Sequence, residues 1–170
     1  MSVKVGLPPI ARKDVRLFIL GSLPGDTSLA AERYYAHSTN QFWRLLGSAI
    51  GEDFNSLEYE QRLARLAQRG IGLWDVVAFA ERPGSLDQAI RNAGHNPVDQ
   101  LHRDFPDLKA IAFNGGAAAR AGRKLIGTPV GITLIDLPSS SAANTAPLAE
   151  KAIAWSRLAE FAVAAQNGER

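Results

Sequence analysis

Four short apolar runs, separated by segments with helical spacing, constrain the fold of this chain more than any other feature. The runs cover residues 15–20, 71–77, 110–113 and 132–136. Runs of this length are typical of buried strands, and strands that alternate with helices favour right-handed βαβ units. We therefore expect an α/β fold, a three-layer α/β/α sandwich with a central, mostly parallel four-stranded sheet.

The segments between and after these runs predict helices and one long loop. Helices are expected over residues 40–51, over residues 56–68, from Gly116 to about Leu125, and over residues 145–165. Residues 80–97 are rich in Gly, Pro, Asn and charge, which favours a loop with a short helix near residues 86–91. Because 170 residues suit one core and no linker interrupts them, a single domain over residues 1–170 is expected.

Composition excludes several kinds of chemistry but leaves the partner open. The chain has no cysteine, which excludes disulfides, thiolate-held zinc and iron–sulfur clusters. Its three histidines lack zinc-site spacing, and no Gly-x-Gly-x-x-Gly or Walker loop occurs, so neither a metal nor a cofactor is expected. A net charge of +2 permits binding to phosphates without requiring it. The lack of a signal peptide or a membrane-length apolar run predicts a cytoplasmic protein.

Two loops that follow apolar runs carry the candidate chemistry. The first begins with Gly-Ser-Leu-Pro-Gly at residues 21–25 and continues to Asn40, and the second contains Leu-Pro-Ser-Ser-Ser at residues 137–141. Loops at the carboxyl ends of parallel strands line one edge of a sheet, so these distant segments can meet in one cleft. The sequence therefore predicts a site at that edge. A serine hydrolase is not favoured, because Gly-x-Ser-x-Gly is missing.

Both loops resemble motifs of the uracil-DNA glycosylase superfamily. The resemblance is carried by residues 21–25, by Tyr-Ala-His at 35–37 followed by Asn-Gln-Phe-Trp at 40–43, and by residues 137–141. It spans nearly the whole chain and is strongest to the hypoxanthine (deoxyinosine) DNA glycosylase branch, then to the mismatch-specific uracil/thymine branch.

The resemblance implies a monofunctional DNA repair glycosylase that hydrolyses the N-glycosidic bond of a deaminated base. Hypoxanthine, uracil and xanthine are the candidate bases. Such enzymes extrude the nucleotide into a pocket, because a base inside a duplex cannot be reached. The implied partner is DNA that contains a deaminated base, with no membrane and no metal, and a monomer is the simplest assembly.

Asn40 is the catalytic residue that the resemblance implies. Related branches carry Asp or Asn as the third residue of the first motif, where it activates or orients water, but Leu23 stands there in this chain. The amide of Asn40 can both donate and accept hydrogen bonds, which suits the orientation of a water against the sugar carbon. From the residues alone, a helix cap by Asn40 or Thr39 is the simpler interpretation.

The resemblance also implies a base pocket between the two loops. Tyr35 would stack on the flipped base, with Tyr34 as its rival, and such stacking is worth about 1–3 kcal/mol per base. Asp75 would read the base edge and Asn114 would line the pocket, although both residue types are also common in turns. The predicted pocket residues are Ser22, Leu23, Pro24, Gly25, Tyr35, Asp75 and Asn114.

The second loop is expected to hold the DNA backbone. Ser139, Ser140 and Ser141 would donate backbone N–H groups to phosphates, as motif loops of this family do, or would form a plain serine-rich turn. Asn144 would contact DNA or cap the last helix. Two other functions remain open, namely a nucleic-acid-binding module that has lost catalysis, which Leu23 favours, and a small-molecule hydrolase on the same scaffold.

Overall fold

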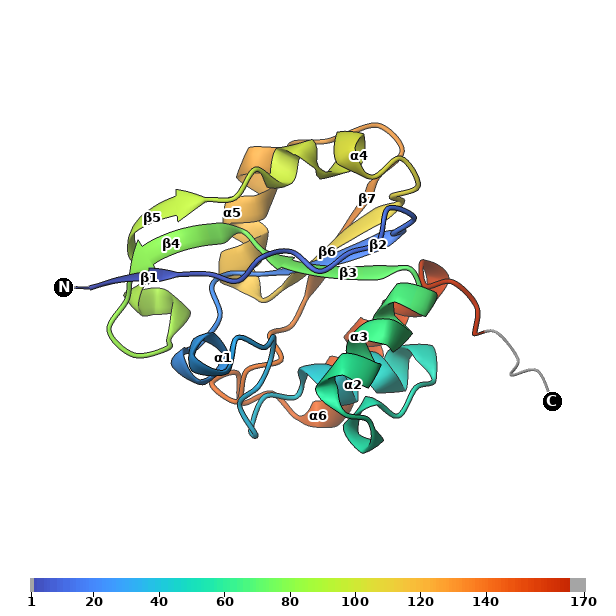
Figure 1. The fold of residues 1–170 in the computed structure, drawn as a ribbon, viewed down its shortest axis with the longest axis horizontal. Coiled ribbons are helices and arrows are strands. Elements are labelled where there is room, and N and C mark those ends of the chain that lie inside the picture. The colour runs from blue at the N-terminus through green and yellow to red at the C-terminus, as the bar shows by residue number, and fades with distance from the viewer. Residues whose placement is uncertain (1, 166–170) are drawn as a thin grey trace.

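The computed structural model describes residues 2–165 and contains a four-stranded parallel sheet (Figure 1). In the order β3–β2–β6–β7, its strands are Ile71–Asp75, Leu17–Gly21, Ala110–Asn114 and Thr133–Leu137. All three pairings are parallel, so the predicted sheet is confirmed. Residue 1 and residues 166–170, which end the predicted domain, lie outside the described part of the chain.

Helices cover both faces of this sheet (Figure 1). One face carries α2 (Phe42–Ile50), α3 (Tyr59–Gln68) and α6 (Leu148–Trp155), and the other carries α4 (Leu101–Asp104) and α5 (Gly116–Ile126). Side chains alternate along β2, so Leu17 and Ile19 pack in the core under α2 and α6. Phe18 and Leu20 pack in the second core, under α4 and α5. The predicted three-layer sandwich is confirmed.

The predicted helices differ most from the structure near the carboxyl terminus. Helices α2, α3 and α5 lie within the expected ranges or differ from them by a residue, and Gly51 closes α2 in the left-handed conformation with a φ of 76°. The prediction of one helix over residues 145–165 is wrong in extent. Pro147 lies at the N-cap of α6, and after Trp155 the chain tightens into the 3₁₀ helix η4, Ser156–Glu160.

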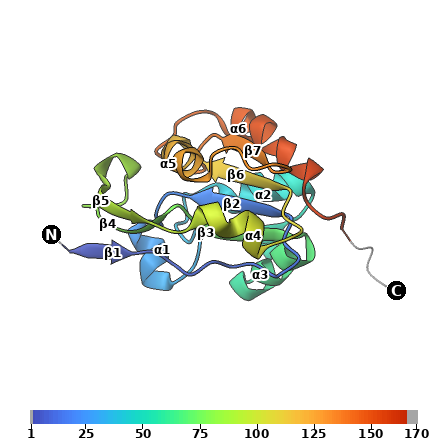
Figure 2. The same ribbon diagram turned by 90° about the horizontal axis from the view of Figure 1, so that it is seen from above.

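A second, antiparallel sheet lies beside the first (Figure 2). Its strands are β1 (Val3–Val5), β4 (Val77–Glu81) and β5 (Arg91–His95). The prediction of a loop over residues 80–97 is therefore wrong where β4 and β5 lie, whereas the short helix expected near residues 86–91 is present as the 3₁₀ helix η2, Asp87–Ala89, between the two strands. The predicted strand over residues 71–77 also divides here, between the two sheets.

Pairing rather than periodicity makes β5 a strand. Its sequence, Arg-Asn-Ala-Gly-His, has no apolar alternation. It pairs with β4, and the Phe79 ring lies so close over Gly94 that a Cβ there would be 2.1 Å from the ring. A strand stabilised by such a cross-strand contact leaves little trace in local composition.

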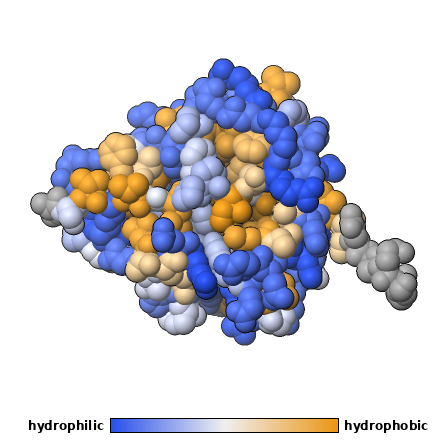
Figure 3. All heavy atoms as spheres, viewed as in Figure 1, coloured by the Kyte–Doolittle hydropathy of each residue, from blue (hydrophilic) through white to orange (hydrophobic). Residues whose placement is uncertain are grey.

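The structure also contains three short helical elements and a group of exposed apolar side chains. The remaining elements are α1 (Asp26–Ala31) and the 3₁₀ turns η1 (Phe54–Ser56) and η3 (Val98–Gln100). Apolar side chains gather on the visible surface of the small sheet (Figure 3), where Val3, Val5 and Phe79 are exposed. Among residues 2–165, no helix combines the length and the apolar character needed to cross a membrane.

Candidate active site

A pocket of about 470 Å³ opens at the carboxyl ends of the parallel strands. It is lined from the first loop, from the second loop and from residues 85–88 between β4 and β5. Gly21 and Asp75 are paired at the ends of β2 and β3, and Asn114 and Leu137 at the ends of β6 and β7. All the residues predicted for catalysis, base binding and DNA contact line this pocket. The expected convergence of the two loops is confirmed, and the size suits a small organic ligand.

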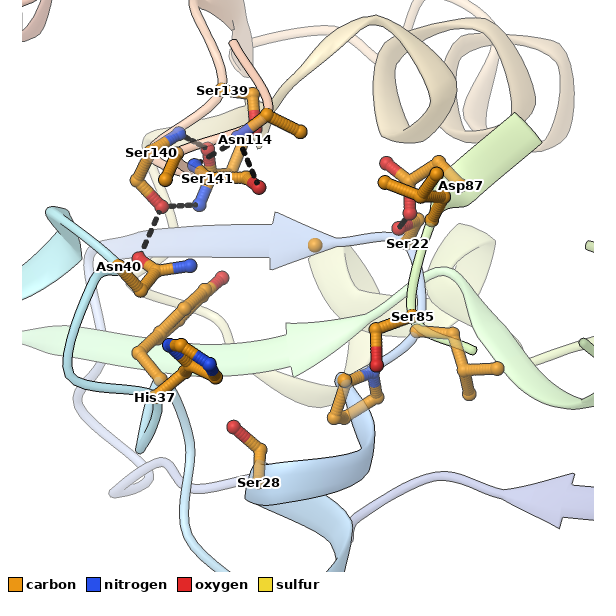
Figure 4. A pocket seen from close by; sticks show the side chains of 18 of the residues that line it. Ser22, Ser28, His37, Asn40, Ser85, Asp87, Asn114, Ser139, Ser140 and Ser141 are labelled. Carbon is orange, nitrogen blue, oxygen red and sulfur yellow. Dashed lines mark hydrogen bonds between the residues drawn. The ribbon is translucent and has the colours of Figure 1, made fainter. Parts of the chain in front are cut away.

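Hydrogen bonds connect Asn40, Ser140 and Asn114 on one side of the pocket (Figure 4). The Ser140 hydroxyl donates to Oδ1 of Asn40 over 2.8 Å and accepts from Nδ2 of Asn114 over 2.9 Å. The backbone N–H of Ser140 donates to Oδ1 of Asn114, also over 2.9 Å. Three segments that are distant in the sequence are thereby held together at the candidate catalytic residue.

Two backbone N–H groups fix which atom donates and which accepts in every hydrogen bond of this network. Because the N–H of Ser140 can only donate, the atom of Asn114 that it meets is the amide oxygen, and the amide nitrogen faces the serine hydroxyl. The hydroxyl therefore accepts from Asn114 and donates to Asn40. The N–H of Phe42 also donates to Oδ1 of Asn40, over 2.9 Å. Both lone pairs of Oδ1 are thus occupied.

The amide nitrogen of Asn40 is left for the pocket. Figure 4 shows Nδ2 directed away from Ser140, toward the open space, and within residues 2–165 no acceptor bonds to it. The same side chain forms a turn just before α2, because its oxygen accepts from the N–H of Phe42, whereas Gln41 occupies the N-cap position of that helix. The turn and the catalytic interpretation therefore use different atoms of Asn40. Toward a ligand, Asn40 can act only as a hydrogen-bond donor.

Tyr35 and Asp75 meet at the end of β2, against Gly21. A Cβ on Gly21 would lie 2.5 Å from Oδ1 of Asp75 and 3.1 Å from the Tyr35 hydroxyl, so only glycine fits. The Tyr35 ring stacks on Phe42, with centroids 3.8 Å apart, and Tyr35 has a φ of 54°. The rival residue Tyr34 is a core residue, 3% exposed, and its hydroxyl donates to the carbonyl of Pro8.

Asp75 is a buried carboxyl group with an unpaired oxygen. Its side chain is 3% exposed, and within residues 2–165 its Oδ2 has no hydrogen-bond partner, nor has the nearby Tyr35 hydroxyl. Burial, and to a smaller extent the charge of Asp87, raises the pKa of Asp75 to about 7. Burial and the charge of Asp75 likewise raise the pKa of Tyr35, so the phenol stays protonated. A buried carboxyl group with a raised pKa at a pocket makes Asp75 a candidate for a functional residue.

The second loop divides its serines between two tasks. Ser140 is 1% exposed, and since its N–H is bonded to Asn114, that N–H cannot also donate to a phosphate as predicted. Ser139 and Ser141 are partly exposed at the pocket, but the N–H of Ser141 donates to the Ser139 hydroxyl over 3.1 Å and is likewise not free for a phosphate. Asn144 accepts from the N–H of Ala146 within a turn, and α6 has Pro147 at its N-cap, so Asn144 does not cap that helix.

Sequence reasoning missed the buried cation that holds the second loop. Lys151 on α6 is 1% exposed and donates to Oε1 of Gln41 over 2.9 Å and to the carbonyl of Asn144 over 2.8 Å. A third, longer bond of 3.3 Å reaches the carbonyl of Ser141. Lysine is seldom buried, so no feature of the sequence identifies Lys151 as the residue that holds this loop.

The first loop is held by residues from the segment that was predicted to be a loop. Arg82 is 1% exposed and donates to the carbonyls of Leu23 and Pro24, over 3.1 and 2.6 Å. Leu23 itself is 5% exposed and packs beside Val77 and Ala80, so it forms part of the apolar wall of the pocket. Because the leucine side chain offers no acceptor or donor there, the polar groups of the pocket come from other residues of this loop and from other segments.

Comparison with known proteins agrees with this geometry. The model of the uracil DNA glycosylase superfamily matches residues 8–159. Two hypoxanthine DNA glycosylases are each 40% identical: that of Methanosarcina barkeri over 152 residues, 89% of this chain and 95% of the relative, and that of Methanosarcina acetivorans over 142 residues, 84% and 89%. The solution NMR structure of a candidate uracil DNA glycosylase from M. acetivorans has a TM-score of 0.84 at 36% identity, covering 94% of this chain and 99% of that one. The resemblance found from the two loops is confirmed, and the chain belongs to the uracil DNA glycosylase superfamily.

Proposed function

We propose that this protein is a monofunctional DNA glycosylase that removes hypoxanthine from DNA, and that uracil and xanthine are secondary substrates. Membership of the superfamily and the names of the two 40% identical relatives support the reaction and the preferred base. The observation that carries the proposal is the fixed amide of Asn40, which presents a donor to a pocket at the carboxyl edge of the sheet.

The proposed reaction is hydrolysis of the bond between C1′ of deoxyribose and N9 of the extruded base. As the bond breaks, its electron pair moves to the base and the sugar gains oxocarbenium character. Water then supplies a hydroxyl group to C1′ and a proton to the departing base. The enzyme lowers the barrier if it stabilises the charge that develops on the base, since such interactions strengthen only in the transition state.

In this account Asn40 donates from Nδ2 to an acceptor atom of the leaving base. Its Oδ1 is already bonded to Phe42 and Ser140, so it has no lone pair with which to accept a proton from water. A donor beside the base gains strength as negative charge accumulates there. This role differs from the orientation of water that the resemblance implied. It does not require a catalytic general base at position 23, where this chain has Leu23.

Asp75 is proposed to select the deaminated base. Hypoxanthine carries a hydrogen on N1, whereas N1 of adenine is a lone pair. In its ionised form, the Asp75 carboxylate that lines the pocket accepts from the former and repels the latter. Tyr35, stacked on Phe42, is proposed to form an aromatic wall against the base. Ser22, Pro24, Gly25 and Asn114 complete the proposed base pocket.

Ser139, Ser141 and Asn144 are proposed to contact the DNA backbone at the pocket mouth. They line the pocket in the loop whose carbonyls accept from Lys151, and their side chains can donate hydrogen bonds to phosphate oxygens. We also propose that residues 1–170 form one domain that works as a monomer in the cytoplasm, without metal or cofactor. One lesion needs one pocket, and the hydrolysis needs only water and positioned hydrogen-bond donors.

The test uses duplex oligonucleotides with a single deoxyinosine, deoxyuridine or deoxyxanthosine, followed by alkaline cleavage of abasic sites. The wild-type protein is expected to cleave at deoxyinosine most rapidly. Asn40→Ala is expected to lose about a hundredfold or more in rate, as removal of one such donor does elsewhere. The control Asn55→Ala removes an exposed amide that lies outside this pocket and should cleave at the wild-type rate.

Two results would contradict the proposal. Binding of lesion DNA without cleavage at any base would favour the binding module that Leu23 suggests. Turnover of free nucleosides, with no DNA binding that weakens as salt increases, would favour a small-molecule hydrolase.

A further inference from the structure

One large apolar side chain stands exposed at the mouth of the pocket. Leu86 lines the pocket and is 52% exposed. The other large apolar side chains that are exposed in residues 2–165, for example Leu125 and Val130, do not line it. The second loop contributes only Ala142 and Ala143 as exposed apolar residues at the mouth, and their side chains end at Cβ.

The backbone that carries Leu86 is tied to the first loop on both sides of the residue. The hydroxyl of Ser85 accepts from the N–H of Asp26 over 2.9 Å, and the carboxylate of Asp87 accepts from the hydroxyl of Ser22 over 2.5 Å. Ser85 and Asp87 lie on the opposite side of the pocket from Asn40 (Figure 4). Leu86 is therefore held at a fixed place on the rim, across from the proposed catalytic amide.

If the pocket binds an extruded base, a fixed and exposed leucine at its rim can contact the DNA from which that base came. Extrusion leaves a gap in the base stack and costs a few kcal/mol of unstacking and unpairing. Apolar side chains that enter base steps are a known means of holding DNA in a distorted form. The neighbouring Arg91 is exposed and donates to the carbonyl of Gln88, so a cation also lies beside this segment for the DNA backbone.

We propose that Leu86 enters the duplex and fills the gap that the extruded nucleotide leaves. This inference rests on the proposed function and adds to it a residue for which neither loop motif provides a counterpart. In this role Leu86 acts on the stacking of the duplex and takes no part in breaking the N-glycosidic bond. Leu86 therefore matters where a base must be extruded from a stack, and it is dispensable on a single strand.

The test compares excision of hypoxanthine from duplex and single-stranded oligonucleotides under single-turnover conditions. Leu86→Ala is expected to lose about tenfold or more on the duplex, since each 1.4 kcal/mol of lost stabilisation is about tenfold in rate. Its rate on the single strand should stay within about twofold of the wild type, and Leu86→Phe should restore the duplex rate. Leu125→Ala, which truncates an exposed leucine on α5 away from the pocket, is the matched control.

A second readout follows extrusion itself. With 2-aminopurine beside the lesion, binding of the wild-type protein should raise the fluorescence, and binding of Leu86→Ala should raise it less. Wild-type rates for Leu86→Ala on the duplex, or an equal loss of rate on both substrates, would overturn the role proposed for Leu86 and leave the proposed function standing. Failure of the wild-type protein to excise hypoxanthine from either substrate would overturn the proposed function and this inference together.

Discussion

At the scale of single residues, Ser140 decides what the Asn40 amide can offer. Ser140→Ala removes one of the two donors to Oδ1 of Asn40 and leaves Nδ2 of Asn114 without its acceptor. A buried polar group left unpaired costs about 1–3 kcal/mol, so the network is expected to loosen around Asn40. We expect kcat for hypoxanthine excision to fall about tenfold, with KM for DNA nearly unchanged.

Steady-state kinetics on duplex deoxyinosine substrates check this prediction. The control is Ser156→Ala, which removes an exposed hydroxyl that follows α6 and donates to the carbonyl of Ile153 in that helix. Full kcat in Ser140→Ala, or a rise in KM instead of a fall in kcat, would show that the network does not position Asn40.

At the scale of elements, α6 holds the second loop through Lys151. The ammonium bonds to neutral acceptors only, and burial lowers the pKa of Lys151. Lys151→Met keeps most of the volume and removes a charge whose burial is costly, which offsets the cost of the three acceptors that it leaves unpaired, so the melting temperature should change little. Without these bonds the loop should hold DNA less well, and we expect KM for DNA to rise about tenfold.

Lys124→Met, an exposed lysine on α5, is the matched control for the loss of one positive charge. Thermal unfolding and steady-state kinetics measured on the same samples separate the two effects. A large loss of melting temperature with KM unchanged would assign Lys151 to folding alone.

The strands differ in how well the sequence predicts them. β2 and β6 were predictable because both faces of a central parallel strand are buried, which leaves an unbroken apolar run. The site was predictable because Asp75 and Asn114 end such runs. β5 was not, since its pairing with β4 and not its composition makes it a strand.

Tertiary contacts account for what the sequence could not supply at the site. Arg82 and Lys151 are residue types that usually lie at the surface, and only the fold buries them against loop carbonyls. The orientation of Asn40 depends on Ser140, which lies 100 positions away in the sequence. The composition near Leu86 predicts a loop with a short helix, and nothing in it indicates that this side chain is exposed at the pocket.

At the scale of the whole molecule, Asp75 links the site to the stability of the fold. Its pKa in the folded state is about 7, against an ordinary value of 3.8. Between these values the folded protein holds a proton that the unfolded chain releases. Stability is therefore fully present below about pH 4 and is lost as the pH rises through 7. At about 1.4 kcal/mol per pKa unit, the loss between pH 5 and pH 8 is about 2–3 kcal/mol.

Asp75→Asn should remove this dependence. Relative to the wild type, the variant should gain stability at pH 8 and gain much less at pH 5, as measured by urea unfolding at both values. Asp107→Asn removes an exposed carboxylate and controls for the change in net charge. An equal effect of Asp75→Asn at pH 5 and pH 8 would contradict the assigned protonation.

The proposed catalysis depends on the amide nitrogen of Asn40 facing the pocket, and the substitution Asn40→Asp tests this orientation most directly. A carboxylate can still accept from Phe42 and Ser140, so the fold is kept, but it has no hydrogen to donate to the pocket. The measurement is single-turnover excision of hypoxanthine from duplex DNA by the wild type, Asn40→Ala and Asn40→Asp. We predict rapid excision by the wild type and a loss of about a hundredfold or more in both variants. Excision by Asn40→Asp at or above the wild-type rate would instead make residue 40 an acceptor that activates water, and would contradict the account.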